Sequence, residues 1–585
     1  MRTHYCGELK EINIDKFVTL CGWVHSYRNL SKIIFLNMRD WSGIIQITFL
    51  EENKKLFKVA KKLKNEFCIQ VFGIVKRRNL KNINKSIKTG FIEVLVKKLT
   101  IINASQPIPI DNSKINSEDI SLKYRYLELR KLELLKKLKI RSKTILLIHK
   151  YMQSKKFMQI ETPILTKITP EGARNYLIPS RIHKKKFYAL PQSPQLFKQL
   201  LMISGIDKYY QITKCFRDED LRSDRQPEFS QIDIEAAFIS EQKIQKIVEN
   251  LISFIWLKIK NITFEKIKKI TFTQSIKDYG TDKPDLRNPM KLFDLKDLLQ
   301  EVENLDFIKK NIESTKKTRI AAICVPNGIV LKEKKIKVLK EELKKKYGFY
   351  ELITILVKEK KLSENYDFDC SILKNYTKKK IILKIIKKIN AKSKDLIIIV
   401  IGISKTVNNV LNKLRMEIGI KLNLVNPNEF KPVWITDFPM FKKEKDGKLC
   451  CLHHPFTQPK NSNIETMKRK PETIISKSYD LVINGYEIAG GSVRNHNFEV
   501  QKTIFKLIGI SEKEQLEKFG FFLESLTYGA PIHAGIALGL DRIIMLLTNS
   551  NSIRDTIAFP KTTSAICPMT NSPDYISNDM LKEIL

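Results

Sequence analysis

The stretch that decides the fold is TKCFRDEDLRSDRQPEFSQIDIE, residues 213–235. Two apolar strand ends flank a loop that is dense in alternating charge, and a solvent-exposed hairpin loop is the simplest explanation of that pattern. Such loops, however, seldom place Arg217, Glu219 and Gln226 between two strands that read as buried. The segment therefore predicts a hairpin that supplies charged side chains to a ligand site.

A second segment, YDLVINGYEIAGGSVR at 479–494, offers matching chemistry. Asp480 and Glu487 are expected to flank an apolar strand, and Arg494 follows a Gly-Gly pair. Paired carboxylates beside phosphate-binding arginines suit Mg²⁺, whose other ligands would be the oxygens of a substrate phosphate. A surface position is the alternative for either carboxylate.

The third segment, HAGIALGLDRIIMLL at 533–547, is a glycine-punctuated strand leading into a helix that opens at Asp541 and Arg542. A helix N-terminus that carries an arginine is an anion site. Neither G-x-x-x-x-G-K-[ST] nor G-x-G-x-x-G occurs in the chain, so a nucleotide site must be built from side chains and metal ions.

Taken together and in this order, the three segments resemble the class II aminoacyl-tRNA synthetases and, within them, the bacterial-type aspartyl-tRNA synthetases. Phe216-Arg-Asp-Glu resembles the second class motif, Gly539-Leu-Asp-Arg the third, and Pro163 the proline of the first. Segments 169–174, 189–198 and 553–561 resemble aspartyl-specific sequences. The resemblance spans almost the whole chain and implies an aspartate–tRNA ligase that works as a homodimer, with Pro163 at the interface.

This resemblance implies that the carboxylate of L-aspartate attacks the α-phosphate of ATP, which gives aspartyl-adenylate and pyrophosphate. Such a reaction depends on positioning and charge neutralisation. Arg217 would hold the α-phosphate and Arg542 the γ-phosphate, as the two catalytic residues, while Asp480 and Glu487 would hold Mg²⁺. Phe229 would stack on adenine, with core packing as its alternative. The implied ATP-binding set is Arg217, Asp218, Glu219, Gln226, Phe229, Glu487, Gly539, Leu540, Asp541 and Arg542.

The resemblance also implies an aspartate pocket. Lys198 and Arg494 would bind the side-chain carboxylate, and Asp233 would orient Lys198. Two cations facing one carboxylate would reject asparagine, because a neutral amide would leave buried charge unpaired, and glutamate would be too long. The full implied set, with the first three members binding the α-ammonium, is Glu171, Ser193, Gln195, Lys198, Arg217, Asp233, His453 and Arg494.

His453 and His454 directly follow Cys450-Cys451-Leu452 and raise the question of a zinc site. Adjacent residues in extended chain point to opposite sides, and the usual spacing of zinc ligands is missing. We therefore expect no zinc there. The resemblance places His453 near the aspartate and the adenylate, and His454 is expected to be a structural neighbour.

The N-terminal region, 1–103, is predicted to be an OB barrel that binds the anticodon. Short strands at 18–25, 33–39, 44–49, 67–75 and 91–99, with a helix at 51–66 after the third, fit that fold. The resemblance implies tRNA contacts, with Phe35 as a stacking platform for a base. A core position is the alternative for Phe35. Ser26 and Tyr27 stand where the family usually has basic residues. The expected tRNA contacts are Arg28, Phe35, Gln46 and Glu93.

Beyond the barrel, residues 104–140 read as a linker and hinge helix, with a helical pattern from 118 to about 157. The catalytic domain is expected at 141–288 and 421–585. Between its parts, 289–420 reads as an inserted α+β domain in which Lys-rich helices alternate with strands such as 320–325 and 396–401. The expected architecture is thus an all-β OB barrel, an α+β catalytic domain on an antiparallel sheet, and an inserted α+β domain.

Composition sets wider limits. The 105 Lys and Arg against 63 Asp and Glu give a net charge of +42, which suits a polyanion such as tRNA or simply reflects A/T-rich codons. The nine cysteines are odd in number and lack any C-x-x-C, which argues against a disulfide framework. The longest apolar run, 396–403, is far too short for a membrane span, and the start shows no signal-peptide pattern. We expect a cytoplasmic protein without a membrane partner.

Three alternatives stay open at this point. A non-discriminating enzyme would also charge tRNA(Asn), which depends on anticodon contacts. A catalytically idle RNA-binding protein would be expected to lose at least one of Arg217, Glu219, Asp480, Glu487 and Arg542, all of which are present. An asparagine-forming enzyme on the catalytic fold would not need the barrel. One departure from the family pattern is Ala489, which replaces an expected glycine and is predicted to tighten the floor of the active site.

Overall fold

The computed structural model describes residues 1–111, 116–169, 172–300, 318–331, 333–358, 368–370, 379–444 and 446–584. The chain divides into two compact units. The first contains Met1–Ile145, Asp220–Pro227 and Ser550–Leu581, and the second consists mainly of Leu146–Glu219 and Glu228–Asn549. Among the residues in these ranges, no helix is long and apolar enough to cross a membrane.

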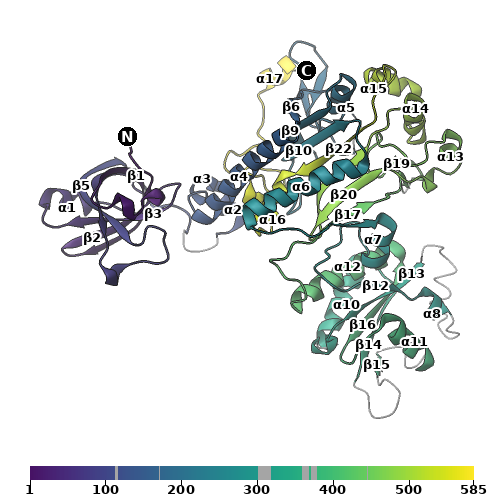
Figure 1. The fold of residues 1–585 in the computed structure, drawn as a ribbon, viewed down its shortest axis with the longest axis horizontal. Coiled ribbons are helices and arrows are strands. Elements are labelled where there is room, and N and C mark those ends of the chain that lie inside the picture. Colours follow the sequence, from purple (N-terminus) through teal and green to yellow (C-terminus); the bar gives the residue numbers. More distant parts are fainter. Residues whose placement is uncertain are drawn as a thin grey trace. The chain divides into compact units, whose positions relative to one another are not determined.

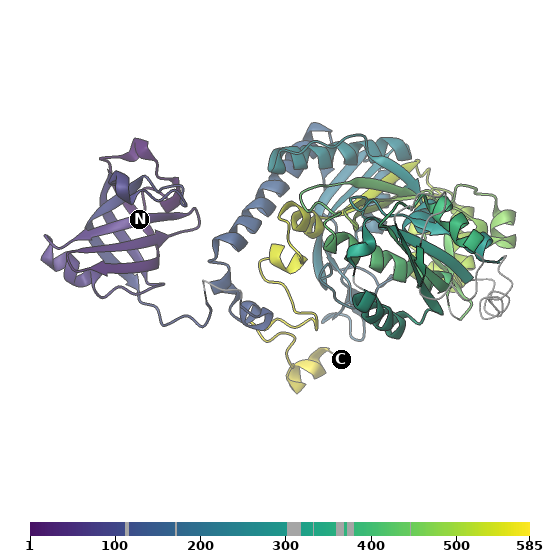
Figure 2. The same ribbon diagram turned by 90° about the horizontal axis from the view of Figure 1, so that it is seen from below.

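The first unit contains a closed five-stranded barrel with the strand order β1-β2-β3-β5-β4 (Figures 1 and 2). Side chains alternate between the barrel interior and the surface, so Ile34, Leu36 and Met38 enter the core while Phe35 and Asn37 do not. The predicted OB barrel is confirmed. Its strands are β1 (Phe17–Leu30), β2 (Ile33–Arg39), β3 (Ile44–Leu50), β4 (Cys68–Arg77) and β5 (Ile92–Asn103), with α1 (Lys54–Ala60) after the third.

Both helices predicted in this unit were too long. The helix expected at 51–66 is only α1, because Asn53 caps its start and Glu66, at a φ of +67°, turns towards Arg39. The helical pattern from 118 is divided into α2 (Glu118–Lys123), α3 (Arg125–Glu128) and α4 (Leu132–Ser154). The first break lies at Tyr124, whose backbone is not helical (φ −105°, ψ 38°). The next residue, Arg125, is buried and its guanidinium donates to the carbonyls of Arg554, Ile557 and Ala558 in the C-terminal segment.

An eight-stranded sheet forms the centre of the second unit, in the order β11-β17-β20-β21-β22-β10-β9-β6 (Figure 1). All neighbours are antiparallel except the edge pairs β11–β17 and β6–β9, so the predicted antiparallel sheet is confirmed. The strands are β6 (Met158–Gln159), β9 (Lys208–Phe216), β10 (Glu228–Ala237), β11 (Lys268–Thr271), β17 (Pro432–Thr436), β20 (Ser478–Ile483), β21 (Tyr486–Val493) and β22 (His533–Gly539).

The two faces of this sheet differ in chemistry. On β10, the buried carboxylates Asp233 and Glu235 alternate with the apolar Ile232 and Ile234, so the acidic residues share one face. Helix α5 (Gln195–Ile203) contacts β10 through Lys198 on that acidic face. Helices α6 (Glu241–Lys260) and α16 (Leu540–Leu547) contact each other and pack on the sheet (Figure 1). The acidic face is therefore the one that offers charged groups to a ligand.

Smaller elements complete the second unit. An aromatic core of Phe456, Phe505, Phe519 and Phe522 joins α14 and α15 to the loop that follows β19. The remaining elements are β7 (Leu177–Pro179), β8 (Phe187–Ala189), α7 (Phe272–Tyr279), β18 (Phe441–Lys443), β19 (Leu449–Cys451), α13 (Ile464–Arg469), α14 (Phe498–Leu507) and α15 (Glu512–Leu526), with α17 (Asn578–Ile584) near the C-terminus of the chain.

The insertion is an α+β structure, as predicted, and its sheet has the order β12-β13-β16-β14-β15 (Figure 1). The central strand β16 is buried along almost its whole length, because one apolar core lies on each side of the sheet. The strands predicted at 320–325 and 396–401 are confirmed. The elements are β12 (Leu292–Asp294), α8 (Lys296–Gln300), β13 (Thr318–Val325), α10 (Glu333–Tyr347), β14 (Glu351–Val357), β15 (Phe368–Cys370), α11 (Lys379–Ile389), β16 (Leu396–Ile403) and α12 (Ser404–Lys421).

Candidate active site

A buried ion cluster lies on the acidic face of the large sheet. Lys198, on α5, places its Nζ 2.6 Å from Asp233 Oδ1 and 3.2 Å from Glu235 Oε2. All three side chains are almost completely shielded from solvent. The contact between Lys198 and Asp233 is the one that the sequence led us to expect, and Glu235 adds a second carboxylate to the same ammonium.

Arg494, at the end of β21, holds the other side of Glu235. Its Nε lies 2.8 Å from Glu235 Oε1 and its Nη2 3.1 Å from Oε2, while Nη1 donates to Ser492 Oγ at 2.8 Å. Glu235 needs a glycine opposite it, because a β-carbon at Gly535 would lie 1.8 Å from its Oε2. Sequence reasoning missed Glu235, although its place two residues after Asp233 on a strand put it on the same face.

The electrostatics of the cluster add to one expectation. Lys198 and Arg494 were expected to face a single substrate carboxylate, which stays a prediction, and Asp233 and Glu235 also pair with these two cations. Burial raises the pKa of Asp233 against the opposing effect of Lys198. Burial also acts to raise the pKa of Glu235, but Arg494 and Lys198 outweigh it and the net shift is downward. Asp233 Oδ2 is buried without a hydrogen-bond partner in the described part of the chain.

The two carboxylates expected to hold a metal lie on neighbouring strands. Asp480 is in β20 and Glu487 in β21, joined by a turn at Asn484 and Gly485, so they do not flank one apolar strand as predicted. Gly490 pairs with Asp480 and leaves space between the carboxylates, since a β-carbon there would lie 3.1 Å from Asp480 Oδ1 and 3.5 Å from Glu487 Oε1. Their placement together was predicted, and the pair Asn484-Gly485, a common signal for a two-residue hairpin turn, could also have predicted the hairpin.

The chemistry of this pair fits a divalent cation. Asp480 Oδ1 is buried and finds no hydrogen-bond partner among the described residues. Burial and the charge of Glu487 raise the pKa of Asp480 well above its usual range. For Glu487, Lys283 and Arg542 outweigh burial and lower the pKa to about 2. Within the described ranges no group of three or more His, Cys, Asp or Glu gathers as a metal site, so the pair would need phosphate or water oxygens to complete a Mg²⁺ shell.

Residues expected to bind ATP lie around these two clusters. Arg217 follows β9, and its guanidinium carbon lies 5.1 Å from the centre of the Phe229 ring on β10. Arg542 Nη1 donates to the Glu487 carbonyl at 2.7 Å, and Asp541 Oδ2 accepts from the Ser230 amide at 2.8 Å.

Four further members of that set have simpler placements. Gly539 is the N-cap of α16 and Leu540 its first residue. Asp218 is exposed and its amide donates to the Arg174 carbonyl at 3.2 Å, and Glu219, which follows it, is partly buried.

Gln226 belongs to the first unit, where both ends of its amide are engaged. Its Nε2 donates to the Lys561 carbonyl at 3.0 Å, and its Oε1 accepts from the Lys561 amide at 2.8 Å. This pairing ties the loop between β9 and β10 to the segment 553–561, which resembled an aspartyl-specific sequence. A nucleotide contact by Gln226 stays a prediction.

The remaining pocket residues are only partly placed. Gln195 opens α5 and is buried, with Nε2 unpaired among the described residues, and Ser193 lies two residues before it, partly buried. Glu171 lies outside the residues that the structure describes. Their assignment to the α-ammonium stays a prediction.

The two histidines have different surroundings. His453 Nδ1 lies 3.8 Å from Asp480 Oδ1, and its ring packs edge-on against Phe438, with centroids 4.3 Å apart. His454 is nearby, and its Nδ1 accepts from the Phe456 amide at 3.2 Å. Burial lowers the pKa of both rings, well below the usual value for His454, where Arg494 and Lys198 add to the effect. Burial thus favours the neutral form of both rings, and His453 is the one beside Asp480.

Ala489 lies on the other face of the sheet. It pairs with Leu481 on one side and Leu538 on the other, both fully buried. Leu481 in turn pairs with Trp434, whose Nε1 donates to Glu249 of α6 at 3.0 Å. The expectation that Ala489 tightens the floor of the active site is therefore wrong, because its methyl group faces the helices behind the sheet.

The four expected tRNA contacts share one outer face of the barrel. Arg28 pairs with Phe35 across β1 and β2, and Gln46 pairs with Glu93 across β3 and β5. Gln46 Nε2 and Thr48 Oγ1 both donate to Glu93 Oε2, at 2.7 and 2.6 Å. Phe35 is half-buried and takes no part in the barrel core, so the core alternative fails.

Comparison with known proteins identifies the family of this chain. A family model described as tRNA synthetases class II (D, K and N) matches residues 117–563, and one described as an OB-fold nucleic acid binding domain matches residues 18–102. The chain belongs to the class II tRNA synthetases of the D, K and N group.

Within that group, the matched relatives include aspartate–tRNA ligases. The enzyme named so from Buchnera aphidicola subsp. Schizaphis graminum is 53% identical over 584 residues, which is 100% of this chain and 99% of the relative. The one from Buchnera aphidicola subsp. Baizongia pistaciae is 49% identical over 98% of this chain and 100% of its own length. The family inferred from the motifs is confirmed.

Solved structures agree on the fold. An asparaginyl-tRNA synthetase from Pyrococcus horikoshii, complexed with asparaginyl-adenylate, matches with a TM-score of 0.59 at 21% identity, covering 96% of this chain and 98% of that one. A putative aspartyl-tRNA synthetase from Leishmania major Friedlin also reaches 0.59, at 18% identity, over 96% of this chain and 94% of its own. At these identities the likeness concerns the fold alone.

Proposed function

We propose that this chain is an aspartate–tRNA ligase. It activates L-aspartate with ATP to aspartyl-adenylate and pyrophosphate, and then transfers aspartate to the 3′ end of tRNA(Asp). The observation that carries the proposal is the buried cluster of Lys198, Asp233, Glu235 and Arg494, because buried cations held in place by carboxylates suit an acidic ligand. The full-length relatives named aspartate–tRNA ligase support it.

Selection of the amino acid rests on the N–H groups of Arg494 and Lys198 that are not used within the cluster. Arg494 uses three of its five N–H groups on Glu235 and Ser492, which leaves two for the side-chain carboxylate of aspartate. Lys198 supplies a third. The amide of asparagine would either point its own N–H groups at the donors of Arg494 and Lys198 or leave some of those donors without an acceptor. Either result costs binding free energy in a site that is closed to water. Asp233 and Glu235 therefore act by holding the two cations charged and fixed.

The adenylation step requires the aspartate α-carboxylate in line with the scissile bond of ATP. Arg217 binds the α-phosphate and stabilises the charge that develops there, while Phe229 and Glu219 hold the adenine. Arg542 binds the γ-phosphate until pyrophosphate leaves. Asp480 and Glu487 are the residues that would hold Mg²⁺, which when bound neutralises charge on the phosphates. The residues contribute position and charge, and none of them forms a covalent bond.

Partners follow from two further surfaces. The barrel face with Arg28, Phe35, Gln46 and Glu93 would bind anticodon bases by stacking and by hydrogen bonds to base edges. The segment around Pro163 carries exposed apolar side chains, Ile164 and Leu165, which supports a homodimer through that segment.

The decisive experiment is ATP–pyrophosphate exchange without tRNA, with aspartate, asparagine, glutamate and lysine offered separately. We expect exchange with aspartate alone. Equal exchange with asparagine would overturn the pocket assignment. Charging of tRNA(Asp) and tRNA(Asn) transcripts, measured next, would then separate a discriminating enzyme from a non-discriminating one.

A further inference from the structure

Lys283 is a charged residue that neither the motifs nor the proposed roles include. Its Nζ lies 2.7 Å from Glu487 Oε2, so a lysine ammonium contacts one of the two carboxylates proposed to hold Mg²⁺. The Lys283 side chain keeps 36% of its exposure, which leaves it room to move. The carboxylate pair therefore already has a cation from the chain itself.

The loop that carries Lys283 is fixed near this position. The Lys283 amide donates to Thr281 Oγ1 at 3.1 Å, and Ser275 Oγ donates to the Thr281 carbonyl at 2.7 Å. The loop also lies against the turn of the β20–β21 hairpin, since a β-carbon at Gly485 would lie 3.6 Å from Asp285 Cβ and 3.9 Å from the Lys283 carbonyl oxygen. The backbone is thus held beside the same hairpin that carries Asp480 and Glu487.

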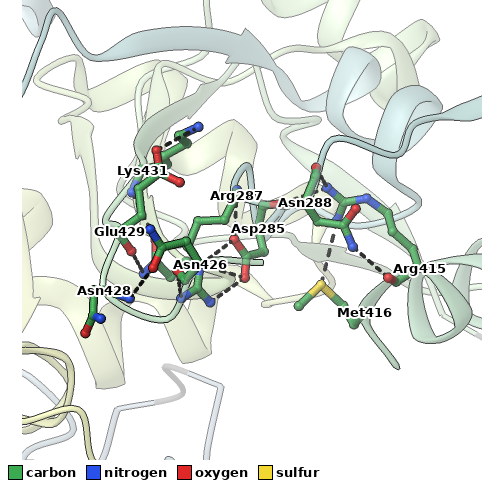
Figure 3. Close-up of polar contacts among 10 residues, drawn as sticks. Asp285, Arg287, Asn288, Arg415, Met416, Asn426, Asn428, Glu429 and Lys431 are labelled. Atoms are coloured by element: carbon green, nitrogen blue, oxygen red, sulfur yellow. Dashed lines mark hydrogen bonds and ion pairs between the residues drawn. The ribbon is translucent and has the colours of Figure 1, made fainter. Parts of the chain in front are cut away.

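The insertion secures the far end of this loop, as Figure 3 shows. Arg415 of α12, fully buried, donates through Nε to the Met290 carbonyl at 2.6 Å and through Nη2 to the carbonyls of Asp285 and Asn288 at 2.6 and 2.7 Å. Asn288 Nδ2 donates back to the Arg415 carbonyl at 2.6 Å. The backbone of the loop around Lys283 is thus held in place, while the Lys283 side chain is partly exposed. Lys283 is therefore suited to reversible contact with a fixed partner such as Glu487.

We infer that Lys283 is a positioning residue: a tethered cation that binds Glu487 in the free protein and gives way to the divalent cation. A metal ion and the ammonium repel each other across the same carboxylate, so metal binding disfavours the ion pair between Lys283 and Glu487. The displaced ammonium then needs another anion, and the triphosphate of ATP provides one. Metal without nucleotide would accordingly bind weakly, and metal with nucleotide would bind well. The inference rests on the proposed metal role of Asp480 and Glu487.

The test is the affinity of the full chain for Mn²⁺ without nucleotide, measured by the electron paramagnetic resonance signal of free Mn²⁺. We expect Lys283→Met to bind Mn²⁺ about fivefold to tenfold more tightly than the wild type, because the competing charge is gone. Lys283→Arg should restore the weaker affinity. A purely structural ion pair would predict unchanged or weaker Mn²⁺ binding in Lys283→Met, and that result would overturn the inference.

Lys431 provides the matched control. It lies near the same hairpin, with its amide donating to Asn484 Oδ1 at 3.0 Å, but its ammonium pairs with Glu429 at 2.9 Å (Figure 3). Lys431→Met should leave Mn²⁺ affinity unchanged, and equal tightening in this variant would show a general charge effect and refute a specific role for Lys283. The double variant with Lys283→Met and Glu487→Gln should lose the tight Mn²⁺ binding of Lys283→Met. If the double variant still bound Mn²⁺ tightly, the metal would lie elsewhere and the inference would be overturned.

These outcomes are independent of the amino-acid substrate. If no variant and no wild type catalysed exchange with aspartate, the proposed function would fail while the Mn²⁺ comparison would still decide the role of Lys283. In the enzyme that does catalyse exchange, Lys283→Met should raise the KM for ATP more than it lowers kcat, because the lost contact is one made with the bound nucleotide.

Discussion

Glu235 shows how much one side chain determines in the proposed pocket. It accepts from both Arg494 and Lys198, and it fits only because Gly535 leaves space opposite it. Removing a partner from a buried ion pair leaves an uncompensated charge, which costs far more than the intact pair contributes. The charges of the pocket therefore depend on a residue that contacts no substrate in the proposed reaction.

Glu235→Gln should lower the free energy of unfolding by about 3–5 kcal/mol, because Arg494 loses its buried counter-charge. Aspartate-dependent pyrophosphate exchange should fall with it. Urea denaturation of the wild type and the variant measures the first effect. Glu429→Gln, which removes an exposed partner of Lys431, is the control and should change stability by less than about 1 kcal/mol.

Ala489→Gly should leave aspartate-dependent exchange unchanged, because the Ala489 methyl group faces the buried side chains behind the sheet. A cost of about 1 kcal/mol in stability is expected for a glycine inside a strand. Exchange kinetics at saturating ATP test the claim. A marked gain in kcat would show that the methyl group does reach the site.

At the scale of secondary structure, the outer face formed by β1, β2, β3 and β5 carries the proposed anticodon contacts. Phe35→Ala should raise the KM for tRNA, since stacking on an aromatic ring contributes about 1–3 kcal/mol per base. Aminoacylation with a tRNA(Asp) transcript measures this. Phe72→Ala removes an exposed ring of β4 that stacks on Phe17, and it should leave the KM for tRNA unchanged. Equal effects of both substitutions would argue against a specific face.

Arg39 at the end of β2 and Arg130 between α3 and α4 share one buried carboxylate. Glu66 accepts from Arg39 at 3.1 and 2.8 Å and from Arg130 at 2.7 Å. Burial acts to raise the pKa of Glu66, but the two arginines outweigh it and hold the pKa below the ordinary 4.5. A group with a depressed pKa stabilises the fold above its unfolded pKa, and that stabilisation is lost as the pH falls through the folded value.

Glu66→Gln should therefore destabilise the protein near neutral pH, and the difference from the wild type should shrink as the pH falls from about 5 towards about 3. Urea titrations followed by circular dichroism at several pH values give this difference. A constant difference across the range would mean that the carboxylate charge is not responsible.

For the whole molecule, the net charge of +42 raises the question of how much of it serves tRNA. Salt dependence of affinity counts the phosphates that a protein neutralises. We expect tRNA affinity to fall by about 10³–10⁵ between roughly 50 and 200 mM salt, as for 6–10 phosphate contacts. Filter binding across that range measures the slope. A slope several times steeper would mean that the dispersed lysines act as one binding surface.

The sequence predicted the architecture well because its signals were local. The barrel strands, the strands of the insertion and the helix that opens at Asp541 all follow from alternation, hairpin signals and capping. It failed where a distant residue decides the outcome. The break after Lys123 lies beside Arg125, which donates to carbonyls more than 400 positions away, and the pairing of Gln226 with Lys561 joins residues 335 apart.

The candidate site shows the same division. Lys198, Asp233 and Arg494 were expected together and lie together. Glu235 was missed although alternation along the strand placed it on the face of Asp233, and Lys283 was missed because nothing near it in the sequence shows that it meets Glu487. The pairing of β10 with β22 places Glu235 opposite Gly535, which leaves it space. The contact of the loop at Lys283 with the β20–β21 hairpin brings Lys283 to Glu487.

The closure of the barrel, from β1 through β4 and back to β1, has a consequence for evolution. In a closed sheet most main-chain donors and acceptors of the strands are taken up by neighbouring strands, so little strand edge is offered to a nucleic acid. In the proposed function, an anticodon would then be distinguished mainly by outward side chains. A descendant could come to prefer a different tRNA through a few surface substitutions, without any change to the interior that keeps the barrel folded.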